Sequence, residues 1–275
     1  MKRILIPIDF SKGAYNSIEY AVQLYKNEPC TFYLINTIYN ADFILHSSIY
    51  EVYRNNSQSG LMEVKEQIEK EYPNTNHTIE IISSYNTLSE EIKIKVEKRE
   101  IDMVVMSTEG GSGGVELLFG TYTAHAIRIA KCPILVIPAK SHYLGIKHIL
   151  FPSDYKLTLC ESKLALLHEI ALAHKPVLHI MHESFGEQLT PLQEESRAAI
   201  DGYFKEVDHH FHSMSKDSVL NAIYGFNQKH PTDLVVMVKN KHTFLEKILF
   251  KSTVNEVSYY VKIPFLVLPS ENYEV

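Results

Sequence analysis

The chain consists of two copies of one pattern, and this duplication restricts its fold more than any other feature. Four segments recur in the same order, the first two at a distance of 145 positions and the last two at 131: residues 2–9 and 147–154, 32–35 and 177–180, 102–106 and 233–237, and 132–138 and 263–269. The paired segments share their apolar positions; KRILIPID, for example, returns as KHILFPSD. We therefore predict two related domains, residues 1–140 and 146–275.

Length and charge agree with two compact domains that do not bind nucleic acid. The 275 residues fit two units of common domain size, and 45% of them are apolar, which is enough for each unit to bury a core. The net charge of −6 is divided evenly, with 14 basic and 17 acidic residues up to Lys140 and 13 and 16 after it. Without a basic excess, nucleic acid is a poor candidate partner.

Apolar runs and cysteines indicate a cytoplasmic protein without a membrane partner. No run approaches the roughly 20 apolar residues that span a bilayer, and the N-terminus enters a strand pattern without an apolar signal segment. The cysteines Cys30, Cys132 and Cys160 lack the spacing of metal ligands and cannot all pair. A reducing cytoplasm is the simplest location.

Each copy alternates short apolar runs with segments of helical periodicity. In the first copy the expected strands are residues 4–8, 32–35, 79–82, 101–106 and 134–137, and the expected helices follow Ser11, span 61–72 and 90–98, and run from Gly120 toward Ala130. Strands separated by helices imply right-handed crossovers. The predicted fold class is therefore α/β, with two doubly wound five-stranded parallel sheets that carry helices on both faces.

The segment of residues 39–60 has the least regular pattern of the first copy, and NNSQSG stands at its end. Such a segment is either a lid over a site or a surface loop, and we favour the loop.

The glycine segment after the fourth strand of the first copy is the main functional signal. Parallel sheets bind ligands beyond the carboxyl ends of their strands, where both Asp9 and this segment fall. Glycines at 110–114 let backbone amides approach an anion, and Gly120 with Thr121 opens a helix whose amides and dipole favour phosphate. The alternative is a flexible surface loop, which composition alone favours. The dinucleotide fingerprint and the GxxxxGK[ST] phosphate loop are both absent.

The order PIDFS, then MSTEG-x9-GT, then KCPILVIP resembles the universal stress protein family, over nearly the whole chain and twice. The resemblance implies a tandem member that packs as an internal pseudo-dimer through its last strands, with a homodimer of the whole chain as a further option. The nucleotide-binding branch of that family uses Gly-x2-Gly-x9-Gly-(Ser/Thr) for ATP phosphates. Gly110, Gly120 and Thr121 match the last three positions, while Ser107 replaces the first glycine.

The same resemblance implies two further ligand contacts. Asp9 corresponds to the acid of the first strand near the adenosine, and Thr37 lies near the position that lines the adenine pocket. In the second copy the motif positions carry Val238, Lys241, Lys251 and Ser252, so the backbone cradle is lost there, although Asp154 persists opposite Asp9. Lys241 and Lys251 either occupy the vacated anion site or are solvated surface residues.

Histidines are concentrated in the second copy, which raises the question of a metal site. His209, His210 and His212 fall in a stretch, residues 192–214, that we expect to be helical, so that His209 and His212 share a face. His179 and His182 form a second pair. Without cysteine or carboxylate at ligand spacing, we expect no metal site, and interpret these residues as surface or interface histidines that titrate near neutral pH.

No catalytic constellation is evident, because the chain lacks a nucleophile elbow, HExxH and CxxC. Our principal hypothesis is a stress-response protein whose first domain binds ATP or a related adenine nucleotide as a regulatory ligand. A nucleotide-free scaffold for an unknown protein partner is the alternative. A slow ATP hydrolase is a third possibility. Any hydrolysis is expected to be slow, because it needs Mg²⁺ and basic groups, and the glycine segment contains no Lys or Arg.

Overall fold

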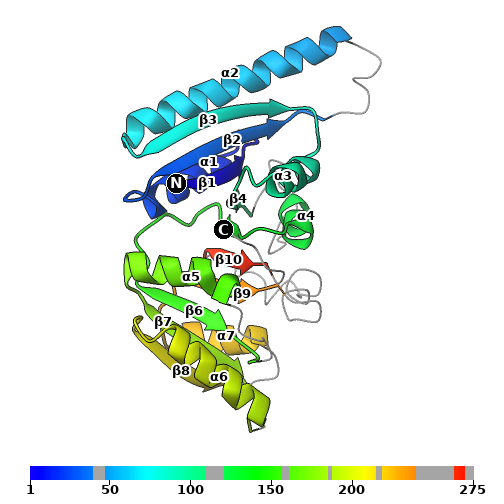
Figure 1. The fold of residues 1–275 in the computed structure, drawn as a ribbon. Coiled ribbons are helices and arrows are strands. Elements are labelled where there is room, and N and C mark those ends of the chain that lie inside the picture. Colours follow the sequence, from blue (N-terminus) through cyan, green and yellow to red (C-terminus); the bar gives the residue numbers. More distant parts are fainter. Residues whose placement is uncertain are drawn as a thin grey trace. The chain divides into compact units, whose positions relative to one another are not determined.

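The computed structural model describes residues 1–39, 47–108, 121–155, 161–184, 188–214, 219–239 and 263–269. These residues belong to two compact units, and the chain passes from the first to the second between Tyr143 and Leu144 (Figure 1). Each unit is an α/β structure built on a parallel sheet. Within the described residues no helix has both the length and the hydropathy required to cross a membrane.

The first unit is a five-stranded parallel sheet in the order β3-β2-β1-β4-β5. Its elements are β1 (Lys2–Pro7), α1 (Lys12–Leu24), β2 (Cys30–Thr37), α2 (Ser47–Glu71), β3 (His77–Ser84), α3 (Leu88–Glu97), β4 (Met103–Ser107), α4 (Thr121–Ile129) and β5 (Ile134–Ile137). Helix α1 packs against β4 and β5, α2 packs against β2 and β3, and α3 contacts α4. Right-handed crossovers thus put α1 and α2 on one face and α3 and α4 on the other.

The second unit repeats this order as β8-β7-β6-β9-β10. Its elements are β6 (His148–Pro152), α5 (Glu161–His174), β7 (Val177–Glu183), α6 (Pro191–Tyr203), β8 (His209–Met214), α7 (Val219–Asn227), β9 (Leu234–Val238) and β10 (Phe265–Leu268). The predicted doubly wound parallel fold is confirmed for both copies.

The cores of both units are formed by strands that are covered on two faces. Ile4, Leu5 and Ile6 on β1 have no exposed surface, and burial of an aliphatic side chain contributes about 1.5–3 kcal/mol. Cys30 and Cys132 are buried free thiols, and burial raises the pKa of Cys30 to about 12. Cys30 is therefore an inert packing group at neutral pH.

A recurring aspartate joins the first and fourth strands of each copy. Asp102 accepts a hydrogen bond from the backbone N of Arg3 at 2.7 Å, and its own backbone N donates to Arg3 O. Asp233 accepts a hydrogen bond from the backbone N of His148 at 2.9 Å, and its own backbone N donates to His148 O. The duplicated Asp before an apolar strand is thus a structural residue that satisfies a strand end.

The prediction of a loop over residues 39–60 is wrong for its described second half. Helix α2 begins at Ser47 and includes NNSQSG. Gly60 lies directly against the ring of Phe10, and Ser57 is almost completely buried. Polar residues with weak helix propensity are therefore helical here because they pack against the rest of the unit.

The prediction of a helix over residues 192–214 is also wrong, because α6 ends at Tyr203 and His209–Met214 is the edge strand β8. The residue period is therefore 2 rather than 3.6. His210 and His212 share a face, whereas His209 lies on the opposite one.

Candidate functional site

Hydrogen bonds join the carboxyl ends of neighbouring strands of the first unit. Ile8 N donates to Ile35 O at 2.7 Å, and Asn36 Nδ2 donates to Ile8 O at 2.6 Å. Thr108 N donates to Ile137 O at 3.1 Å. The strand ends that carry Asp9, Thr37 and Ser107 therefore meet at one edge of the sheet.

Asp9 forms the turn between β1 and α1. Its Oδ1 accepts hydrogen bonds from the backbone N and the hydroxyl of Ser11 at 3.0 and 2.6 Å. Ser11 in turn accepts from Ala14 N at 3.2 Å, which confirms the expected helix cap. Phe10 between them has a φ of 61°, a conformation rare for bulky residues. The exposed carboxylate of Asp9 is thus oriented by the local turn.

Ser107 is accommodated by a glycine in α1. A Cβ placed on Gly13 would lie 2.5 Å from the Ser107 hydroxyl oxygen and 3.3 Å from Ser107 Cβ. Since real Cβ atoms do not approach this closely, only glycine fits at position 13 while Ser107 keeps its place. The hydroxyl that replaces the first glycine of the family motif is therefore directed against α1.

Thr108, which the sequence analysis did not single out, is the most informative residue at this edge. It is 5% exposed, and its hydroxyl has no hydrogen-bond partner among the residues that the structure describes. Next to it, Thr123 in the first turn of α4 donates from its hydroxyl to Ser107 O at 2.9 Å, which anchors the N-terminus of α4 at the end of β4. A buried hydroxyl without a partner costs about 1–3 kcal/mol, so this group is suited to a ligand. The only sequence signal was a hydroxyl residue directly after a buried strand.

Gly110 and Gly120 lie outside the described residues, and Thr121 is described only as the first residue of α4. In the second copy, Val238 ends β9 as a buried residue, and Lys241, Lys251 and Ser252 also lie outside the described residues.

A cavity of about 340 Å³ opens beside Asp9, between α1 and α2. Its lining includes Ile8, Phe10, Tyr15, Gly60 and Glu63. The ring of Phe10 is 47% exposed there. This cavity therefore provides both apolar surface and polar groups at the edge that carries Asp9.

The corresponding positions of the second copy form a closed stack of rings. Tyr155 corresponds to Phe10 and also has a positive φ, of 53°, but it is only 2% exposed. His182 corresponds to Thr37, and its ring stacks on Tyr155 with centroids 4.8 Å apart. His182 Nδ1 also lies 3.0 Å from Ser153 O. The two copies thus differ in the side chains at this edge while sharing its backbone.

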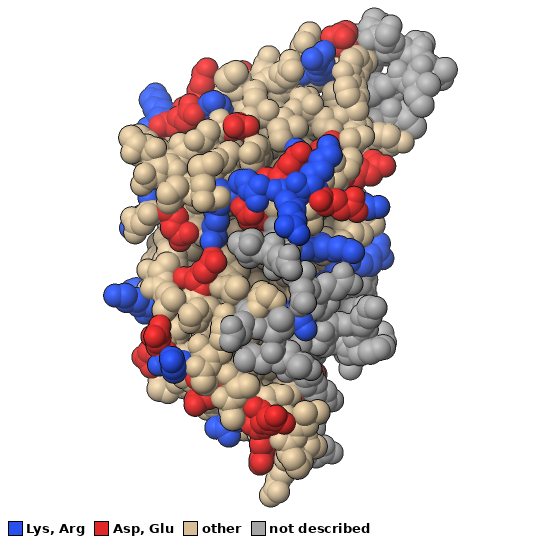
Figure 2. Space-filling view, in the orientation of Figure 1, with Lys and Arg blue, Asp and Glu red and all other residues tan. Residues whose placement is uncertain are grey.

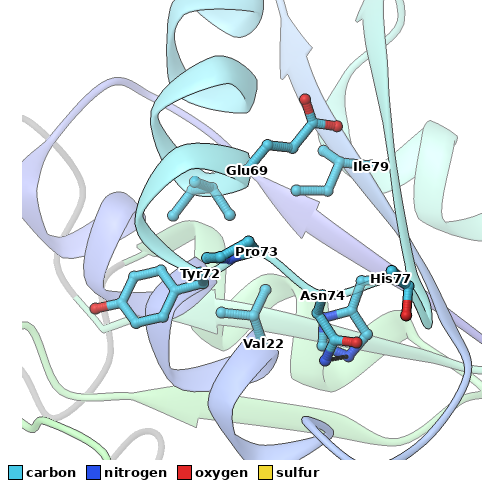
Figure 3. A pocket seen from close by; sticks show the side chains of 9 residues that line it. Val22, Glu69, Tyr72, Pro73, Asn74, His77 and Ile79 are labelled. Atoms are coloured by element: carbon cyan, nitrogen blue, oxygen red, sulfur yellow. Dashed lines mark hydrogen bonds between the residues drawn. The ribbon is translucent and has the colours of Figure 1, made fainter.

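A second cavity, of about 370 Å³, lies at the amino-terminal ends of the strands of the first sheet (Figure 3). Val22, Tyr72, Pro73 and Ile79 provide apolar walls, and His77, the first residue of β3, lies beside Asn74. The Nε2 atom of His77 is 3.0 Å from Tyr25 O. Because β3 begins here, this cavity is remote from the carboxyl ends that carry the predicted site residues.

Comparison with known proteins agrees with the fold and identifies the family. The sequence profile of the universal stress protein family matches residues 1–138. The chain belongs to the universal stress protein family. A universal stress protein of Methanocaldococcus jannaschii is 28% identical over 142 residues, which is 50% of this chain and 81% of that protein.

Solved structures extend the similarity over both copies. A universal stress protein from Archaeoglobus fulgidus has a TM-score of 0.69 at 17% identity and covers 97% of this chain and 96% of its own. A functionally unknown protein from Pseudomonas aeruginosa has a TM-score of 0.61 at 14% identity, with coverage of 98% and 92%. At these identities the likeness shows the fold alone, whereas the match to the family profile confirms the recognition of the family from the sequence.

Proposed function

We propose that the first domain binds ATP or a related adenine nucleotide as a regulatory ligand. The observation that carries this proposal is the buried hydroxyl of Thr108 at the carboxyl edge of the sheet, for which the described part of the chain provides no hydrogen-bond partner. It adjoins the N-terminus of α4, which Thr123 anchors. A hydroxyl donor and free helix amides at one point favour an anionic group such as a phosphate.

The remaining site residues have complementary roles in this proposal. The backbone at Gly110 and Gly120 and the residue Thr121 would hold the phosphates, Asp9 would accept hydrogen bonds from the ribose, and Thr37 would line the base. Charge-assisted hydrogen bonds contribute about 1.5–3 kcal/mol each, so three or four of them contribute about 4.5–12 kcal/mol, from which the entropic cost of binding is subtracted.

The site is better suited to binding than to hydrolysis. The described residues proposed for it, Asp9, Thr37, Ser107, Thr108 and Thr121, include one acid and no base. A Mg²⁺ ion with the nucleotide would supply charge neutralisation, but phosphoryl transfer also depends on basic groups from the protein. Any ATPase activity is therefore expected to be slow. The buried free thiols support a reducing, cytoplasmic location as part of the same proposal.

Isothermal titration calorimetry of Thr108→Val tests the assignment. Loss of a hydroxyl that bonds a phosphate should raise the Kd for Mg-ATP by about 10- to 100-fold, while the isosteric change leaves the fold intact. Thr78→Val, on an exposed position of β3, is the matched control and should bind like the unmodified chain. Equal affinity of both variants would place the nucleotide elsewhere.

The nucleotide-free scaffold is the competing function, and the closed ring stack of Tyr155 and His182 favours it for the second domain. Mass spectrometry of the supernatant after denaturation of the purified chain separates the two. Copurified adenine nucleotide supports a regulatory site, whereas its absence together with no calorimetric signal supports the scaffold.

A further inference from the structure

Five histidines gather on one face of the second sheet, under α7. They come from β6, β7, β8 and the turn after α7: His148, His179, His210, His212 and His230. His179 is central and 6% exposed, and its ring also contacts Phe226 of α7 at a centroid distance of 5.2 Å. The other four are more exposed, so the cluster extends from the solvent to the core.

Three of these rings form a hydrogen-bonded chain. His148 Nδ1 lies 3.3 Å from His179 Nε2, and His179 Nδ1 lies 3.1 Å from His212 Nε2. Each contact needs one N–H and one lone pair. Three neutral imidazoles satisfy both contacts, and so do three imidazoles that share one additional proton. A second additional proton removes the last lone pair of one contact and converts it into a repulsion between two N–H groups.

The described surroundings of the cluster contain few acidic groups that could offset such protons. Asp233 accepts from the backbone N atoms of Lys147 and His148, and Asp208 lies 3.5 Å from the outermost ring, that of His210. Buried Glu183 is four residues further along β7 than His179. The helix that covers the cluster, α7, has the sequence VLNAIYGFN and contains no charged residue.

The positions of the first copy that correspond to His148 and His179 do not carry histidine. Arg3 corresponds to His148, and its guanidinium pairs with Asp102 at 2.7 Å. Leu34 corresponds to His179 and is fully buried. A permanent ion pair and an aliphatic side chain therefore stand where the second copy has titratable rings, and the first unit serves as an internal reference in any experiment on the whole chain.

The electrostatics agree with a cluster that resists protonation in the folded state. Burial, and after it the charges of the neighbouring histidines, lower the pKa of His179 to about 4, and the same causes lower the pKa of His212. The unfolded chain, with histidine pKa values near 6.5, binds more protons than the folded chain between these limits. The folded state is therefore favoured above about pH 6.5 and loses stability as the pH falls toward 4.

We propose that the His148–His179–His212 chain is an acid-sensitive switch that loosens β8 and α7 from the second sheet when the cluster takes up a second proton. At neutral pH the chain of imidazoles links three adjacent strands, β6, β7 and β8. Acidification breaks one link and opens the edge of the sheet, because a second added proton leaves two N–H groups facing each other across one contact of the chain. Within the described residues no group of three or more potential ligands has the geometry of a metal site.

Hydrogen exchange of the intact chain at pH 7.5 and 5.0, corrected for intrinsic rates, tests the proposal. Protection of His209–Met214 should fall at least about tenfold at pH 5.0 while that of Lys2–Pro7 is unchanged. His179→Phe, which keeps a ring in the core, and the milder His212→Asn should each remove most of this pH dependence. His182→Phe is the matched control on the same strand, and it should retain the dependence.

Three results would overturn the proposal. The first is an equal loss of protection in both units, and the second is pH dependence that persists in both His179→Phe and His212→Asn. The third is stoichiometric zinc, found by atomic absorption, whose removal with a chelator abolishes the pH dependence, because the cluster would then be a metal site. Failure of the two variants to fold leaves the unmodified chain as the test, since unchanged protection of β8 at pH 5.0 contradicts the switch directly.

Discussion

The contact between Gly13 and Ser107 predicts that two changes which are each moderate alone will be strongly coupled. In an open helix, Gly→Ala stabilises a protein by about 0.5–1 kcal/mol. At Gly13 the new methyl group would lie 2.5 Å from the Ser107 hydroxyl oxygen and 3.4 Å from Ala139 Cβ. Overpacking of this kind costs about 1–3 kcal/mol. We therefore expect Gly13→Ala to destabilise the first unit by about 0.5–2 kcal/mol.

Ser107→Gly removes the obstructing hydroxyl, so Gly13→Ala in the Ser107→Gly background should be neutral or stabilising. The coupling free energy of this double-mutant cycle should be at least about 1 kcal/mol. It is measured by urea denaturation, with exchange of the β1 amides to assign the transition to the first unit. Gly202→Ala is the control, because nothing lies within 4 Å of a Cβ at that position in α6, and it should stabilise the chain.

A coupling within about 0.5 kcal/mol of zero would refute the reasoning, since Gly13 and Ser107 would then be independent. The same variants inform the nucleotide proposal. Because the hydroxyl of Ser107 is directed against α1, Ser107→Gly should preserve or tighten ATP binding. A marked loss of affinity would instead identify this hydroxyl as a phosphate ligand.

Three further predictions concern the ligand and the proton. Gly120→Lys, which introduces the residue of the second copy, should largely abolish ATP binding in calorimetry while the circular dichroism spectrum stays native; unchanged affinity would contradict the use of this backbone. ATP at a hundredfold excess over Kd should stabilise the first unit by about 2.7 kcal/mol, seen as exchange protection in residues 103–108 and 121–129, whereas protection of the second unit alone would reverse the assignment. The lowered pKa of His179 should cost the second unit up to about 3 kcal/mol between pH 6.5 and 4, measured by urea denaturation across this range, and a flat profile would exclude it.

The parallel sheets were predictable because their strands are buried on both faces. Runs such as ILI at residues 4–6 and VVM at 104–106 are apolar without alternation, and they recur in both copies. Ser11 was recognisable as a helix cap because its hydroxyl satisfies a local amide. These features depend on short-range patterns, which is why they could be predicted from the sequence.

The incorrect predictions concern segments whose conformation depends on distant partners. NNSQSG is helical because Gly60 fits under the ring of Phe10, 50 positions earlier in the sequence. HHFHSM is a strand because it pairs with β7, where His210 lies beside His179. Likewise, neither the match between Gly13 and Ser107 nor the missing partner of Thr108 could be read from the chain, since each is a property of packing between elements.

The two copies show how one backbone accommodates two kinds of site. In both copies the aromatic residue that follows the aspartate of the first strand has a left-handed backbone conformation, so the turn itself is shared. In the first copy the ring of Phe10 borders a cavity, whereas in the second Tyr155 is covered by His182. In the second copy, the ring of His182 thus occupies the position that corresponds to Thr37, the residue proposed to line the adenine base in the first copy. Reopening the second copy would therefore require removal of this stack as well as restoration of the glycines, and glycines introduced alone at positions 241 and 251 should not confer nucleotide binding.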